Sequence, residues 1–224
     1  MKNWIFVLLV VAMTTDFSAQ TIAADTAYRP KTYDEQVDQF EAYPNAEEDI
    51  IFLGNSITAR THWDELLQLP AARNRGISGD TTFGLLERLD EITEGNPKKV
   101  FILIGINDIS RNFPDEIIIE NYKEILRRIK EESPATRVYV QTILPVNGSF
   151  GIYKNHYGKD AHILKINNFL KGLKKEKGLV IIDLHDHFLD TNNRLDAKYT
   201  EEGLHLNAKG YQMWAELLKP YLKE

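Results

Sequence analysis

The sequence predicts a three-layer α/β domain in which a doubly wound, five-stranded parallel sheet lies between two layers of helices. Three observations favour this fold. The chain has 224 residues, a length typical of a single domain. Short apolar runs rich in Ile and Val alternate with longer amphipathic stretches, which is the pattern of strand–helix units. The apolar runs are nearly continuous rather than alternating, as in parallel strands that are buried on both faces.

The expected strands are short apolar runs separated by enough residues for a crossover helix. They cover residues 50–53, 72–75, 100–104, 137–142 and 179–183. The run at 72–75 has the weakest pattern and stands directly before Gly76. In doubly wound sheets the groups that bind and react lie at the carboxyl ends of the strands. Polar loops that contain glycine follow the first three of these runs, so we expect the functional site there.

Each expected helix repeats apolar residues at the spacing of one helix face. The helices cover residues 82–93, 115–132, 161–176 and 208–222. Residues 25–48 are polar and have no clear period, so we interpret them as a lead-in segment on the surface of the domain. The domain itself is expected at 49–224, without an internal repeat or a second domain.

The N-terminus has the features of a secretory signal. Lys2 precedes an apolar run at 4–13, and small or polar residues follow up to Ala24. This order predicts a signal peptide at 1–24, because the run is shorter than the roughly 20 residues that span a bilayer. We therefore expect an exported protein, periplasmic or extracellular, that meets the membrane only during export. Cleavage after Ala19, Ala23 or Ala24 stays open, as does an uncleaved anchor.

The composition excludes some partners. The formal net charge of −6 argues against a nucleic-acid partner, because such a surface needs basic side chains to neutralise phosphates. The chain has no cysteine, so neither disulfides nor a Cys-linked lipid anchor can form. The composition gives no oligomeric state.

Four polar segments stand at expected strand ends or helix entries. They are Gly54-Asn55-Ser56-Ile57-Thr58, Arg75-Gly76-Ile77-Ser78-Gly79-Asp80, Gly105-Ile106-Asn107-Asp108 and Glu202-Gly203-Leu204-His205-Leu206-Asn207. In this order and at these spacings they resemble the blocks of the SGNH/GDSL hydrolase family. The resemblance covers residues 50–222. It implies the flavodoxin-like SGNH hydrolase fold and a serine esterase that needs neither a metal nor an organic cofactor.

The residues in these segments fit that chemistry. A serine hydroxyl such as that of Ser56 is a poor nucleophile until an adjacent base takes its proton. His205 is the best candidate base, because Glu202 stands three residues before it and can hold the imidazole in the correct tautomer. The resemblance implies an oxyanion hole made by the backbone N–H groups of Ser56 and Gly79 and the side-chain amide of Asn107. Loss of one such donor costs about 10² to 10³ in turnover.

The match to the family has two departures. Position 55 holds Asn where the family name implies Asp, but that side chain is not expected to take part in bond making. Glu202 stands where the family has Asp, so the pocket must accommodate one more methylene. Glu201 is a neighbouring alternative acid, and Ser78 is a rival nucleophile.

Plainer structural interpretations remain for several residues. Ser56 could be a helix N-cap, and Asp108 is expected to support its loop rather than react. His185 and His187 could suggest a metal site, but no third ligand is evident. The aromatic residues at 62–63 and 153–157 either shape a substrate cleft or pack in the ordinary way.

A further resemblance indicates a class of substrate. Residues 74–82 and 144–147 resemble the branch of the family similar to platelet-activating-factor acetylhydrolase. This resemblance implies removal of small acyl groups, mainly acetyl, from carbohydrates such as O-acetylated sialic acid or polysaccharide. The alternatives are a lysophospholipase or thioesterase that acts on lipids, and a non-catalytic glycan-binding module.

Overall fold

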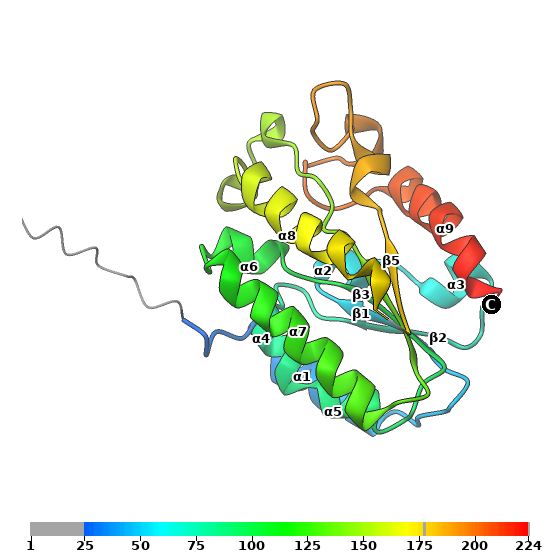
Figure 1. The fold of residues 1–224 in the computed structure, drawn as a ribbon. Coiled ribbons are helices and arrows are strands. Elements are labelled where there is room, and N and C mark those ends of the chain that lie inside the picture. Colours follow the sequence, from blue (N-terminus) through cyan, green and yellow to red (C-terminus); the bar gives the residue numbers. More distant parts are fainter. Residues whose placement is uncertain (1–24, 177, 224) are drawn as a thin grey trace, which may run out of the picture.

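The computed structural model describes residues 25–176 and 178–223 (Figure 1). The expected signal peptide at 1–24 lies outside the described residues. Within the described ranges, no helix is both long enough and apolar enough to cross a membrane.

A five-stranded parallel sheet forms the centre of the molecule, in the order β2-β1-β3-β4-β5. Its strands are β1 (Ile50–Gly54), β2 (Ala72–Gly76), β3 (Lys99–Leu103), β4 (Arg137–Gln141) and β5 (Leu179–Ile182). Each of them overlaps an expected strand, and the predicted α/β fold is confirmed. In the register of the sheet, Gly54 lies beside Gly76 on one side and Leu103 on the other. The carboxyl ends of the three neighbouring strands β2, β1 and β3 therefore meet at one edge, where their loops begin.

Helices cover both faces of the sheet (Figure 1). On one side lie α4 (Thr82–Glu87), α5 (Leu89–Thr93), α7 (Asp115–Glu132) and α8 (Asp160–Gly172), and α3 (Trp63–Leu67) and α9 (Ala208–Leu222) lie on the other. The α3/α9 side is held by aromatic packing. The Phe52 ring stacks on Trp63 with a centroid distance of 4.0 Å, and the Trp63 ring meets Trp214 of α9 edge-on. Burial of these large rings anchors the strand that leads to the site.

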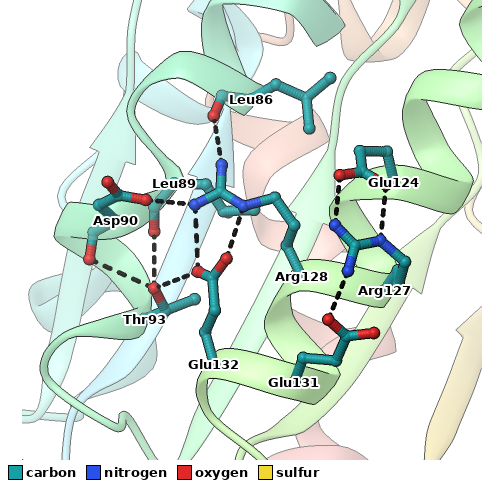
Figure 2. A network of polar contacts seen from close by, with 9 residues as sticks. All are labelled: Leu86, Leu89, Asp90, Thr93, Glu124, Arg127, Arg128, Glu131 and Glu132. Atoms are coloured by element: carbon teal, nitrogen blue, oxygen red, sulfur yellow. Dashed lines mark hydrogen bonds and ion pairs between the residues drawn. The ribbon is translucent and has the colours of Figure 1, made fainter.

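One predicted helix is divided in the structure. Residues 82–93 were expected to form a single helix, but the backbone leaves helical geometry at Arg88, which separates α4 from α5. The Arg88 side chain turns into the interior, where it donates to Asp80 and to the Gly54 carbonyl. Arg128 of α7 donates to the carbonyl of Leu86 near this break, as Figure 2 shows. The buried side-chain contacts outweigh the helical periodicity of the segment.

The remaining helices are short, or they differ from the helices that the sequence predicted. The lead-in segment contains a helix that its sequence did not predict, α1 (Tyr33–Ala42), which buries Tyr33 against the carbonyl of Gly84. The third expected helix ends early, because α8 is followed by the 3₁₀ turn η3 (Leu173–Lys175). The other short elements are α2 (Ser56–Ala59), α6 (Ile106–Ser110), η1 (Gly148–Phe150), η2 (Lys154–His156), η4 (His185–Phe188) and η5 (Ala197–Tyr199).

Candidate active site

Ser56 stands at the first position of α2, directly after the central strand β1. The N-cap of this helix is Asn55, whose side chain accepts from the N–H of Ile57 at 3.0 Å. The Ser56 hydroxyl is therefore not needed for capping, and the N-cap interpretation of Ser56 is wrong. A Cβ at Gly54 would meet the carbonyl oxygen of Leu103 at 2.2 Å, so glycine is needed here for the close approach of β1 to β3. These local features direct the Ser56 hydroxyl to the edge of the sheet.

His205 lies in the loop before α9 and reaches back to Ser56. Its Nε2 atom is 2.9 Å from Oγ of Ser56, although the two residues are 149 positions apart. On the other side of the ring, Nδ1 lies 2.9 Å from both carboxylate oxygens of Glu202. Tyr153 packs edge-on against the imidazole at a centroid distance of 5.2 Å. The structure thus brings the three predicted residues Ser56, His205 and Glu202 into one chain of contacts.

The loop that holds Glu202 and His205 has a constrained backbone. Gly203 has a φ of +83°, and a Cβ there would lie 2.2 Å from the carbonyl oxygen of Asn147. The Thr200 hydroxyl donates to the His205 carbonyl at 2.7 Å, and the Tyr157 hydroxyl donates to the Glu202 carbonyl at 2.7 Å. With this backbone the longer Glu side chain folds back onto the imidazole. The added methylene at position 202 is accommodated by the loop.

The pKa shifts of His205 and Glu202 leave Nε2 of the imidazole without a proton at neutral pH. Burial lowers the pKa of His205 below its ordinary value of 6.5, and the cation of Arg60 adds to this shift, while Glu202 opposes it. Burial works to raise the pKa of Glu202, but hydrogen bonds from the ring and backbone of His205 outweigh it and lower that pKa. At neutral pH the imidazole is therefore mostly neutral and the carboxylate is ionised. With Nδ1–H donating to Glu202, the bare Nε2 faces the serine hydroxyl.

Gly79 and Asn107 lie in the loops after β2 and β3. Gly79 has a φ of +85°, a conformation that side chains disfavour. Asn107 of α6 donates one Nδ2–H to the carbonyl of Asp80 at 2.8 Å, and its Oδ1 lies 3.2 Å from Nε2 of His156. This leaves the second amide hydrogen of Asn107 available. In the described part of the chain, the N–H groups of Ser56 and Gly79 have no protein acceptor.

Two buried carboxylates support these loops from below. Asp80 pairs with Arg88 at 3.0 Å, and both side chains are almost completely buried. Asp108 accepts from the N–H and the hydroxyl of Thr82, at 3.0 and 2.6 Å. Burial raises the pKa of Asp108 to about 7, against the opposing hydrogen bonds from Thr82. Asp108 fastens α4 to the α6 loop, as its structural interpretation predicted.

A polar hollow of about 490 Å³ opens beside Gly79 and Asn107. Within residues 25–176 and 178–223, its lining contains polar and aromatic side chains but no aliphatic one: Tyr28, Gly79, Asn107, Ser110, Arg111, Asn112, Asn155 and His156. The sequence did not indicate that Tyr28 and Arg111 line this hollow. It also did not indicate the contact between His156 and Asn107. Position alone could have suggested Arg111, because it follows closely after the block that contains Asn107.

The alternative residues lie elsewhere. The Glu201 carboxylate accepts from Asn207 at 2.9 Å, whereas the imidazole of His205 contacts Glu202. Trp63 is a core residue and does not line a cleft. His185 pairs with its neighbour Asp186 at 3.0 Å. Across residues 25–176 and 178–223, no group of three or more His, Asp or Glu side chains is arranged to hold a metal ion.

Comparisons with known proteins agree with this geometry. A model of the GDSL-like Lipase/Acylhydrolase family matches residues 52–213. Platelet-activating factor acetylhydrolase IB subunit alpha2 of Rattus norvegicus is 26% identical over 180 residues, which are 78% of this chain and 74% of that protein. N-acylneuraminate cytidylyltransferase of Streptococcus agalactiae is 25% identical over 182 residues, 78% of this chain but 40% of that protein.

A solved structure is similar over most of its length. This Streptococcus pneumonia protein, named for platelet activating factor, superposes with a TM-score of 0.76 at 29% identity and covers 86% of this chain and 93% of its own. The family model spans most of the chain, and its range includes the Ser56, Gly79, Asn107 and His205 segments. The chain therefore belongs to the GDSL-like lipase/acylhydrolase (SGNH) family and is a serine carboxylic ester hydrolase.

Proposed function

We propose that this esterase removes acetyl groups from carbohydrates, with Ser56 as nucleophile, His205 as general base and Glu202 as the acid that orients it. The observation that carries the mechanism is the contact of 2.9 Å between Oγ of Ser56 and Nε2 of His205. That distance is within the range for direct proton transfer between a nucleophile and its base. The carboxylate of Glu202 on Nδ1 stabilises the imidazolium that forms.

The reaction proceeds in two steps. Oγ of Ser56 attacks the acyl carbonyl while its proton passes to Nε2 of His205, and the carbonyl oxygen becomes an oxyanion. The N–H groups of Ser56 and Gly79 and the amide of Asn107 receive that charge. His205 then gives its proton to the leaving sugar hydroxyl, and the bond to the acyl carbon breaks. Water, deprotonated by His205, then attacks the acyl carbon of the acyl-enzyme. The bond between that carbon and Oγ of Ser56 breaks, His205 returns the proton to Oγ, and acetate leaves.

Two considerations support a small acyl group on a polar alcohol. In the part of the chain that the structure describes, the hollow beside the oxyanion hole is lined without aliphatic side chains, and a long alkyl chain would gain little there by burial. One relative is named as an acetylhydrolase and another for N-acylneuraminate, a sugar. The signal-like N-terminus supports an exported, periplasmic or extracellular site of action, where polysaccharide or glycan esters are met.

The test is hydrolysis of p-nitrophenyl acetate, butyrate and octanoate and of acetylated glycans by the wild type and by Ser56→Ala. We expect acetate esters to be preferred and Ser56→Ala to lose nearly all activity, while the matched control Ser78→Ala keeps it. Retention of most activity in Ser56→Ala would remove the mechanism. A preference for octanoate would favour the lipid-directed alternative. Absence of labelling by a fluorophosphonate probe would favour a non-catalytic glycan-binding role.

A further inference from the structure

We propose that the hollow beside Gly79 and Asn107 binds a carboxylate on the substrate through Arg111, so that the preferred substrates are acetylated acidic sugars. This inference rests on the proposed function and names a substrate class for it. The hollow borders the oxyanion hole, because Gly79 and Asn107 belong to both. One substrate molecule can therefore place its acyl carbonyl at Ser56 and a charged group in the hollow.

The charge of the hollow is opposite to that of the whole chain. The protein has a formal net charge of −6, and such a surface repels anionic substrates in general. Among the described residues, the lining of the hollow nevertheless contains the cation of Arg111 and no carboxylate. Lys159 adds a second positive charge just behind it by donating to the side chain of Asn112. The hollow is thus a local cationic site next to the reacting atoms.

Arg111 has no carboxylate partner among the described residues. Most arginines of the described chain are paired: Arg75 with Glu91, Arg88 with Asp80 and Arg128 with Glu132, for example. The Arg111 guanidinium lies over the ring of Tyr28. Stacking on an aromatic face holds the plane of a guanidinium while its N–H edges stay open to a bidentate acceptor. A substrate carboxylate has the matching geometry.

A second residue with a hydrogen-bond donor, Asn112, lines the same hollow. Oδ1 of Asn112 accepts from Lys159, so the Nδ2 hydrogens of Asn112 remain available. Asn112 has a φ of +61°, which places it at a turn directly after Arg111. Arg111 and Asn112 are adjacent in sequence and both line the hollow, and the guanidinium and the amide NH₂ are both hydrogen-bond donors. Such a pair recognises an acceptor-only group such as an ionised carboxylate.

The lead-in segment completes this site. Tyr28 lines the hollow and stacks on Arg111, and Arg29 is anchored to Glu87. The side of Gly79 that lacks a Cβ faces Pro30 and Tyr28. Residues before the sheet therefore build one wall of the hollow.

The experiment compares two matched substrates, an O-acetylated sialic acid and the same sugar with its carboxylate converted to a carboxamide. We expect the wild type to prefer the acid by about tenfold or more in kcat/KM, the effect of a charge-assisted hydrogen-bond pair. Arg111→Gln should bring the ratio close to one, and Arg111→Lys should keep part of it. High salt should reduce the wild-type ratio. The matched control is Arg60→Gln, which removes another cation near Ser56 and should keep the ratio.

A ratio near one in the wild type, or one that Arg111→Gln leaves unchanged, would overturn the inference. So would loss of the preference in Arg60→Gln together with its retention in Arg111→Gln. Calorimetry of both sugars with the Ser56→Ala variant gives a readout that needs no turnover, and there the acid should bind more tightly by a similar factor. If neither ester is hydrolysed but the acid still binds through Arg111, the proposed reaction fails and the carboxylate site stands.

Discussion

Glu202 holds His205 at two points, the ring and the backbone. Its carboxylate lies 2.9 Å from Nδ1 with both oxygens, and Oε1 also accepts from the backbone N–H of His205. The two residues are three positions apart, and the turn between them is closed at Gly203 by a positive φ. The side chain therefore fixes the position of the imidazole as well as its tautomer.

Replacing Glu202 by Gln should lower kcat severely. If the amide oxygen of the introduced side chain keeps the hydrogen bond from the backbone N–H of His205, the amide NH₂ group faces Nδ1. An NH₂ donor at Nδ1 favours the imidazole tautomer that carries its proton on Nε2. That tautomer cannot accept the proton of Ser56, and a comparable change in a serine protease costs on the order of 10⁴ in kcat. We expect a loss of about 10³ to 10⁴, measured with p-nitrophenyl acetate.

The matched control is Glu201→Gln, one position earlier, where the carboxylate contacts Asn207. We expect this variant to keep activity near that of the wild type. Equal losses in both variants would mean that neither carboxylate acts specifically on His205, and the assignment of Glu202 would be lost.

The pH dependence should report the lowered pKa of His205. Burial and the Arg60 cation favour the neutral imidazole, and the base must be neutral to accept a proton. kcat/KM should therefore rise with pH and reach half of its plateau below pH 6.5, the ordinary pKa of histidine. Arg60→Gln removes the cation that helps to lower the pKa of His205, so the midpoint of the pH profile should move to higher pH. A midpoint that stays in place, or moves to lower pH, would contradict this account of the base.

Much of the site was predictable because it depends on chain order. The apolar runs placed the strands, and the rule that parallel strands present their carboxyl ends at one edge brought the Ser56 and Asn107 loops together. The resemblance added Gly79, His205 and the order of the blocks. The strand pattern and the resemblance together place Ser56 and His205 close to each other, although 149 positions separate them.

What could not be predicted depends on tertiary contacts. The break at Arg88 is set by a buried partner, Asp80, whereas the helical period of 82–93 continues through it. The contact between His156 and Asn107 joins a loop without periodicity to a helix entry. The wall that Tyr28 forms depends on how a polar segment folds back. Hydrophobic patterns that repeat every 2 or 3.6 residues predict strands and helices but carry no information about such contacts.

His156 should act as a positioning residue for the oxyanion hole. Its Nε2–H donates to Oδ1 of Asn107 at 3.2 Å while Nδ2 of Asn107 donates to the carbonyl of Asp80. The amide is thereby held at both its oxygen and its nitrogen, and its second N–H is left without a protein acceptor among the described residues. His156→Phe should lower kcat by about tenfold with little change in KM, less than the 10² to 10³ expected for Asn107→Ala.

The effects of these two changes should not add. The double variant His156→Phe/Asn107→Ala should be no slower than Asn107→Ala alone, because the interaction has already been lost. His156→Gln, which can keep an N–H donor, should recover part of the activity. His162, a half-exposed histidine that pairs with Asp115, supplies the control His162→Phe. Additive losses in the double variant would show that His156 acts by another route.

The buried pair Asp80–Arg88 should be the main polar determinant of stability at the site. Both side chains are at most 1% exposed, and Arg88 also donates to the carbonyl of Gly54, behind Ser56. Arg88→Met leaves the Asp80 carboxylate buried without its partner, which should lower the free energy of unfolding by about 3–5 kcal/mol. The double variant Asp80→Asn/Arg88→Met should recover part of this loss, because no unpaired charge remains.

The pH dependence of this loss has a definite sign. Burial already raises the pKa of Asp80, and Arg88 opposes that shift. Without Arg88 the folded-state pKa rises further above the unfolded value, so the folded state binds the extra proton and stability falls as pH increases. Urea unfolding should therefore show a larger deficit for Arg88→Met at neutral than at mildly acidic pH. Arg127→Met, which removes the exposed pairs drawn in Figure 2, should change stability far less, and equal deficits in the two variants would contradict the role of burial.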